Sequence, residues 1–187
     1  MSLTDSTMMP LGTAAPDFDL PDPVSGNDLS FEEVAGTQGT LVMFICNHCP
    51  YVIHIADEIA AIAAQYSPQG IGFVAISSND ISARPEDGPT FMKAFAEKYQ
   101  FTFPYLYDES QATATAYDAV CTPDFFLFDG QGKCAYRGQF DDSRPKSGLP
   151  VTGADLRASL DALLEGEMIP ADVQVPSQGC SIKWKAG

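Results

Sequence analysis

Two cysteines stand three positions apart in the segment Cys46-Asn-His-Cys-Pro50. A Cys-x-x-Cys pair can cycle between a dithiol and a disulfide, and its thiolate form is the nucleophile of that exchange. We expect Cys46 to attack or receive a mixed disulfide and Cys49, one helical turn further on, to resolve it. The spacing therefore predicts thiol–disulfide chemistry.

The elements on either side of this pair favour the same chemistry. The apolar run Thr40–Ile45 predicts a strand buried on both faces. The following segment, 51–66, has apolar residues at helical spacing, and Pro50 suits the first turn of that helix because its missing N–H costs nothing there. Unpaired backbone N–H groups at a helix start favour an anion, so we expect a lowered pKa at Cys46. An imidazolium at His48 would stabilise that thiolate further.

The rest of the chain predicts an α/β fold. In order, we expect a strand over 71–77, a helix from Pro89, a short strand over 104–107, a weak helix over 110–117, a strand over 124–128, a hairpin turn at 129–132, a partner strand over 134–140, and a helix opened by a capping box at Thr152-Gly-Ala-Asp155. Early strand–helix–strand units pair in parallel and the late hairpin is antiparallel, which gives a mixed central sheet flanked by helices. We expect one domain over 1–187, with an N-terminal extension over 1–39 and an irregular C-terminal tail over 166–187.

Composition excludes several classes of partner. The 187 residues carry a net charge of −15, so phosphate backbones and anionic lipid surfaces would repel the chain. No apolar run approaches the roughly 18 residues that a membrane-spanning helix needs. The first ten residues do not resemble a secretory signal. We therefore expect a cytoplasmic protein that binds neither nucleic acid nor membranes.

The other cysteines and one histidine are less informative. A structural zinc site normally needs a second close cysteine pair, which favours redox over metal chemistry at Cys46 and Cys49. We interpret Cys134 as a core or surface residue, while Cys180 could be free or could fold back onto the active face. We expect His54 to be a solvated helix residue that pairs with an acidic residue at i+3 or i+4.

Four segments in this order along the chain resemble the thioredoxin-like superfamily, in particular its AhpC/TSA-type, peroxiredoxin-like branch with a Cys-x-x-Cys. They are Gly12–Phe18 (GTAAPDF), Leu41–Pro50, Thr122–Asp129 (TPDFFLFD) and Gly179–Lys185 (GCSIKWK). The resemblance implies a thioredoxin-like fold and partners that are protein or small-molecule thiols and disulfides, and also peroxides. It implies a thioredoxin- or glutathione-type electron donor and no bound cofactor or metal.

The resemblance also assigns roles to residues outside the pair. It implies that Pro123 is the cis-proline that shapes the substrate groove, which would bring Cys121 close to Cys46 and Cys49 as a third thiol. With His48 these residues form the expected catalytic set. The alternative is that Cys121 is a small buried cysteine without a role in the chemistry. Because an imidazolium stabilises the reduced form, we expect a reduction potential above the roughly −270 mV of thioredoxin.

Two alternative functions stay open. One is a thiol peroxidase in which peroxide oxidises Cys49 or Cys46 and a neighbouring cysteine resolves it. With Cys49 at the peroxidatic position, however, Cys46 stands where the family has threonine and Pro123 about where it has arginine. That departure removes the groups that position peroxide. The other alternative is a non-enzymatic copper- or zinc-binding protein that uses Cys46, Cys49 and a histidine.

Overall fold

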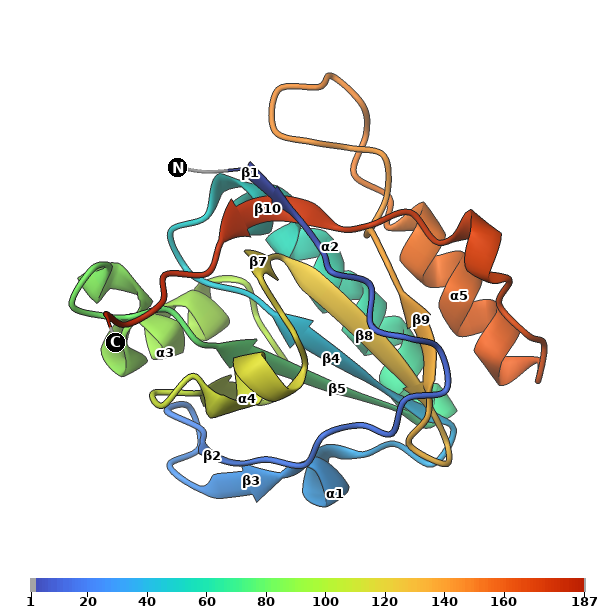
Figure 1. Ribbon diagram of the computed structural model, residues 1–187, viewed down its shortest axis with the longest axis horizontal. Helices are drawn as coiled ribbons and strands as arrows, with labels where there is room; N and C mark the ends of the chain where they lie inside the picture. Colours follow the sequence, from blue (N-terminus) through green and yellow to red (C-terminus); the bar gives the residue numbers. More distant parts are fainter. Residues whose placement is uncertain (1–2, 187) are drawn as a thin grey trace.

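A five-stranded mixed sheet forms the centre of the molecule, as the sequence predicts (Figure 1). This computed structural model describes residues 3–186. The strand order is β6-β5-β4-β8-β9, in which β4 pairs in parallel with β5, β5 in parallel with β6, and β8 antiparallel with both β4 and β9. The strands are β4 (Gly39–Phe44), β5 (Ile71–Ser77), β6 (Tyr105–Tyr107), β8 (Asp124–Asp129) and β9 (Cys134–Arg137).

Alternate residues of β4 point to opposite faces of the sheet and enter two separate hydrophobic cores. Leu41 and Met43 face a core that also contains residues of three helices, α2 (Pro50–Tyr66), α3 (Pro89–Lys98) and α5 (Ala154–Leu164). Val42 and Phe44 face the second core, which packs against α4 (Ala112–Ala116) and α1 (Phe31–Val34). Burial on both faces explains why this strand is a continuous apolar run rather than an alternating one.

Five short strands lie outside the central sheet. β2 (Asp19–Pro21) and β3 (Asp28–Ser30) form an antiparallel hairpin within the N-terminal extension. The other three form a small antiparallel sheet in which β10 (Gln178–Ser181) lies between β1 (Leu3–Asp5) and β7 (Cys121–Thr122), as Figure 1 shows. Three single-turn 3-10 helices lie at Ser67–Gln69, Pro85–Asp87 and Ala171–Val173. No helix within 3–186 is long and apolar enough to cross a membrane.

Two predictions about the C-terminal third were wrong. The tail over 166–187 is not irregular throughout, because four of its residues form β10. Its sequence, Gln-Gly-Cys-Ser, carries no β-forming signal, and only pairing with distant strands makes it a strand. The capping box at Thr152 is also absent. Gly153 is the N-cap of α5, with φ +62°, and the backbone N–H groups of Thr152 and Gly153 donate instead to the carboxylate of Asp141, both at 2.7 Å.

Candidate active site

Cys46 and Cys49 lie between the end of β4 and the start of α2. Cys49 is the N-cap residue of that helix, with extended backbone angles, and Pro50 occupies its first turn as the sequence predicts. The backbone N–H of Ile45 donates to Ile76 of the neighbouring strand at 3.0 Å, which fixes the chain just before Cys46. Both cysteine side chains are fully buried.

Thr122 contacts both sulfur atoms of the pair. The Sγ atom of Cys46 lies 3.3 Å from the Thr122 hydroxyl, and the Cys49 thiol donates to the Thr122 carbonyl oxygen at 3.3 Å. The peptide bond between Thr122 and Pro123 is cis, as the resemblance implied. The sequence analysis did not predict a role for Thr122. Its position directly before the expected cis-proline would have pointed to it.

The third thiol at this site is Cys180 and not Cys121. The Sγ atoms of Cys49 and Cys180 are 2.9 Å apart. Cys121 instead donates to the carbonyl oxygen of Pro123 at 3.7 Å. Successive strand residues point to opposite sides, so a β7 strand that turns Thr122 toward the pair turns Cys121 away from it. Cys134 is buried in the second core, which agrees with its interpretation as a core residue rather than a surface residue.

His48 pairs with a buried carboxylate, that of Asp87, which no sequence motif predicted at this site. Its Nδ1 atom lies 2.6 Å from Oδ2 of Asp87 and 3.7 Å from Sγ of Cys46. Asp87 also accepts hydrogen bonds from the backbone N–H of Asn47 at 2.8 Å and the side-chain amide of Asn79 at 2.8 Å. Burial alone would raise the pKa of Asp87, but these hydrogen bonds outweigh it and hold the pKa below its ordinary value.

The thiolate of the reduced site is most stable on Cys49. Burial raises the pKa of Cys46 well above its ordinary value, and the neighbouring sulfur of Cys49 and the charge of Asp87 raise it further. Hydrogen bonding from Cys46 lowers the pKa of Cys49 to about 5 against the effect of burial, with further hydrogen bonds from Cys180 and the backbone of Val52. The lowered pKa that was expected at Cys46 is found at Cys49 instead, because burial dominates at Cys46 while hydrogen bonding outweighs burial at Cys49.

One group of side chains at this site could also hold a metal ion. Ligand atoms of Cys46, His48 and Asp87 all lie within 4.8 Å of one another. The Nε2 atom of His48 is buried and has no hydrogen-bond partner within residues 3–186. Thiolate, imidazole and carboxylate suit zinc, which commonly takes this mixture of ligands.

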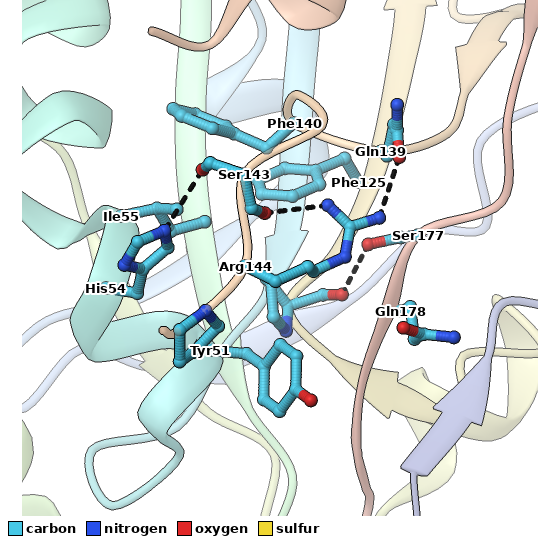
Figure 2. Close-up of a pocket in the computed structure, with 12 residues that line it drawn as sticks. Tyr51, His54, Ile55, Phe125, Gln139, Phe140, Ser143, Arg144, Ser177 and Gln178 are labelled. Carbon is cyan, nitrogen blue, oxygen red and sulfur yellow. Dashed lines mark hydrogen bonds between the residues drawn. The ribbon is translucent and has the colours of Figure 1, made fainter. Parts of the chain in front are cut away.

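Pro123 lines a hollow beside the first turn of α2 (Figure 2). Arg144 lies in it, and its guanidinium donates to the carbonyl oxygens of Asp141 and Ser143 and to the side chain of Gln139, each at 2.7 Å. His54 is part of the same wall. Its Nε2 atom lies 3.0 Å from the hydroxyl of Ser143, so the expected pairing with an acidic residue of its own helix was wrong. The other residues that line the hollow include Tyr51, Ile55, Phe125, Phe140 and Gln178.

Comparison with known proteins identifies a matching protein family, a related oxidoreductase and a similar crystal structure. The model of the AhpC/TSA family matches residues 11–137. Thiol-disulfide oxidoreductase ResA of Geobacillus thermodenitrificans is 28% identical over 133 residues, which are 70% of this chain and 70% of that protein. A crystal structure of an uncharacterized conserved protein from Geobacillus kaustophilus is 54% identical, with a TM-score of 0.97, and the match covers 100% of this chain and 98% of that one.

A more distant structure shows which fold this is. The thioredoxin domain of a thiol-disulfide oxidoreductase from Bacteroides vulgatus superposes with a TM-score of 0.61 at 18% identity, over 82% of this chain and 99% of that one. Identity this low shows the fold alone. The chain therefore has a thioredoxin-like fold, as its sequence predicts.

Proposed function

Since the chain belongs to the AhpC/TSA family, we propose that it is a thiol–disulfide oxidoreductase whose redox-active pair is Cys46 and Cys49. The observation that carries this proposal is the arrangement at Thr122, one residue whose hydroxyl and carbonyl oxygens each lie 3.3 Å from one sulfur of the pair. Its partners would be protein or small-molecule disulfides, with a thioredoxin- or glutathione-type donor to restore the dithiol.

The roles within the pair follow from the two environments. In the first step the Cys46 thiol passes its proton to the Cys49 thiolate. The Cys46 thiolate then attacks a substrate disulfide and forms a mixed disulfide, and the first substrate sulfur leaves as a thiolate that takes the proton back from Cys49. In the second step Cys49 attacks the Cys46 sulfur, and the electron pair of the mixed disulfide leaves with the second substrate thiol. A Cys49 sulfur that hydrogen bonds already stabilise as a thiolate suits the second step, because no separate base has to remove its proton at high cost.

Pro123 and the hollow beside it provide the surface on which a substrate would lie. Tyr51 comes from the first turn of α2, next to the pair, and Pro123 follows directly after Thr122. A substrate bound across these two residues would reach the sulfur atoms from the side on which α2 begins. His48 and Asp87 do not line this hollow, and the charge of Asp87 raises the pKa of Cys46.

A glutathione redox titration tests this proposal, with rapid alkylation and mass-spectrometric mapping of all five cysteines. In Cys180→Ser, which lacks the sulfur atom that lies 2.9 Å from that of Cys49, we expect Cys46 and Cys49 to become protected together at one potential. Cys46→Ser should lose disulfide turnover completely. Cys134→Ser is the matched control, because its sulfur lies in the second core. If Cys46 and Cys49 remained independently alkylatable at every potential, the proposal would be wrong.

One observation favours a second candidate, a thiol peroxidase. The pKa of about 5 belongs to Cys49, the cysteine at the position that is peroxidatic in the resembled family. A low pKa makes a thiolate available to peroxide but does not position the oxidant. Stopped-flow oxidation by hydrogen peroxide separates the two candidates. A rate for Cys49 no faster than that of a free low-pKa thiol excludes the peroxidase.

A further inference from the structure

The third sulfur at this site is held in place from a distant part of the chain. Cys180 lies on β10, where it pairs with Thr122 of β7 on one side and Leu3 of β1 on the other. The Cys180 side chain is 3% exposed, and its sulfur is 2.9 Å from that of Cys49. That separation is shorter than a van der Waals contact between two sulfur atoms. The two atoms would have to move little to reach the bond length of a disulfide, about 2.05 Å.

The backbone around Cys180 is built for this close approach. A side chain at Gly179 would collide with the carbonyl oxygen of Thr122, so only glycine lets β10 lie this close to the cis peptide. The Ser177 hydroxyl donates to the Pro123 carbonyl oxygen at 2.7 Å. Beyond the strand, the backbone N–H of Lys183 donates to the side chain of Asn79 at 2.8 Å. Contacts on both sides of Cys180 therefore fix its position against the active site.

We propose that Cys180 is a third redox thiol, which exchanges with the pair by attacking the Cys49 sulfur of a Cys46–Cys49 disulfide. This inference rests on the proposed function for the disulfide that it rearranges. In the step, the bond between the sulfurs of Cys180 and Cys49 forms while the bond between Cys49 and Cys46 breaks. The electron pair leaves with the Cys46 sulfur, which takes up the proton that Cys180 lost. The chain stays oxidised by two electrons, so the step needs no further oxidant.

The electrostatics of the oxidised pair favour this attack. In the reduced site, burial first, and then the hydrogen bond and charge of Cys49, raise the pKa of Cys180 to about 12. A Cys49 sulfur within a disulfide carries no charge, which removes the last two effects, while the cation of Lys183 still lowers the pKa. Cys180 therefore becomes a better nucleophile at the moment when Cys49 becomes a target.

The exchange has two consequences for the site. It ties β10 covalently to the start of α2, and it returns Cys46 to the thiol form beside the Thr122 hydroxyl. The oxidised protein then carries one disulfide and one active-site thiol, which can attack a second substrate disulfide. A two-cysteine site would have to be reduced before it could react again.

Mass-spectrometric mapping of wild-type protein and three single variants tests the exchange. Each protein is oxidised with glutathione disulfide, quenched by acid and alkylation, and digested without reduction. In Cys46→Ser we expect a Cys49–Cys180 disulfide as the main oxidised species, in place of a glutathione adduct on Cys49. In wild type we expect the Cys46–Cys49 disulfide first and the Cys49–Cys180 disulfide second, at a rate independent of glutathione concentration. Cys134→Ser should behave as wild type.

The outcomes separate this inference from the proposed function. If Cys46→Ser yields only a glutathione adduct on Cys49, with Cys180 still alkylatable, the exchange does not occur. A rate of Cys49–Cys180 formation proportional to glutathione concentration overturns the intramolecular step as well. In Cys180→Ser the Cys46–Cys49 disulfide should still form. Its absence in that variant would count against the proposed function. The Cys49–Cys180 bridge is measured separately, in Cys46→Ser.

Discussion

The Nδ1 atom of His48 lies 2.6 Å from Oδ2 of Asp87, so the histidine between the two cysteines has a carboxylate as its partner. A cationic His48 would stabilise the thiolate of Cys46, but the anion of Asp87 opposes that effect at nearly the same place. The reduction potential should therefore lie closer to that of thioredoxin than His48 alone would predict.

Replacing this carboxylate should expose its effect on the neighbouring thiol. In Asp87→Asn we expect the pKa of Cys46 to fall, because the negative charge of Asp87 is one of the effects that raise it. The reduction potential should rise, because the reduced form gains stability as its thiolate becomes easier to form. Alkylation rates as a function of pH and the glutathione titration measure both changes.

Glu86→Gln is the matched control for this change, since its side chain pairs loosely with Arg84 at 3.7 Å rather than with His48. It removes the same formal charge one residue away. Equal shifts in the two variants would mean that Asp87 acts only through net charge and not through its place beside His48.

Asp124 should make the fold less stable as the pH rises. Burial raises its pKa to about 7, and the Ser6 hydroxyl and nearby backbone N–H groups offset only part of that effect. A folded-state pKa above the unfolded value near 4 means that the folded chain binds the extra proton. The free energy of unfolding then falls between about pH 4 and pH 7, at about 1.4 kcal/mol for each pH unit.

Asp124→Asn should remove this dependence. We expect a thermal midpoint above that of wild type at pH 8, and little difference at pH 4, where the wild-type carboxyl group is neutral in the folded state. Thermal unfolding across this range measures it. A wild-type midpoint that rises steadily from pH 5 to pH 8 would mean that Asp124 is ionised at little cost.

Gly179→Ala should push β10 away from the active site, because its Cβ atom would collide with the Thr122 carbonyl oxygen. We expect the Cys49–Cys180 disulfide to form about tenfold more slowly or slower still, because an activation barrier higher by about 1.4 kcal/mol already slows a reaction tenfold. Timed alkylation of the oxidised protein measures the rate. Gly148→Ala is the control, because its Cβ would meet open space and change only the local backbone preference.

Arg144 should favour anionic disulfides in the hollow beside Pro123. The chain carries a net charge of −15, which disfavours anionic substrates. The positively charged guanidinium of Arg144 lines this hollow and would attract a substrate carboxylate. In Arg144→Gln we expect KM for glutathione disulfide to rise by about fivefold, or about 1 kcal/mol, with kcat unchanged. An uncharged disulfide should show no change in either constant.

Lys146→Gln provides the comparison for Arg144, because it removes one positive charge from the same loop at a residue that does not line the hollow. An equal rise of KM in both variants would assign the effect to long-range charge. A change of KM for the uncharged disulfide would instead indicate that Arg144 shapes the loop.

The sequence by itself determined most of the framework, and it predicts the chemistry that we propose for this site. The apolar run at Thr40–Ile45, followed by Cys-x-x-Cys and a proline, already placed the cysteines at a strand–helix junction, because strand burial and helix starts leave local signals. The same holds for the antiparallel hairpin after Asp124. The cis peptide at Pro123 was implied by resemblance, and a cytoplasmic location remains a prediction.

Only the tertiary structure decided which groups surround the sulfur atoms. Asp87 reaches His48 across 39 positions of sequence, and Cys180 reaches Cys49 across 131. Contacts of that range depend on how whole strands and loops pack, and a single residue's neighbours in sequence carry no sign of them. The low pKa lies at Cys49 rather than at the expected Cys46 for the same reason, since it depends on the burial and the hydrogen bonds that the fold gives to each sulfur.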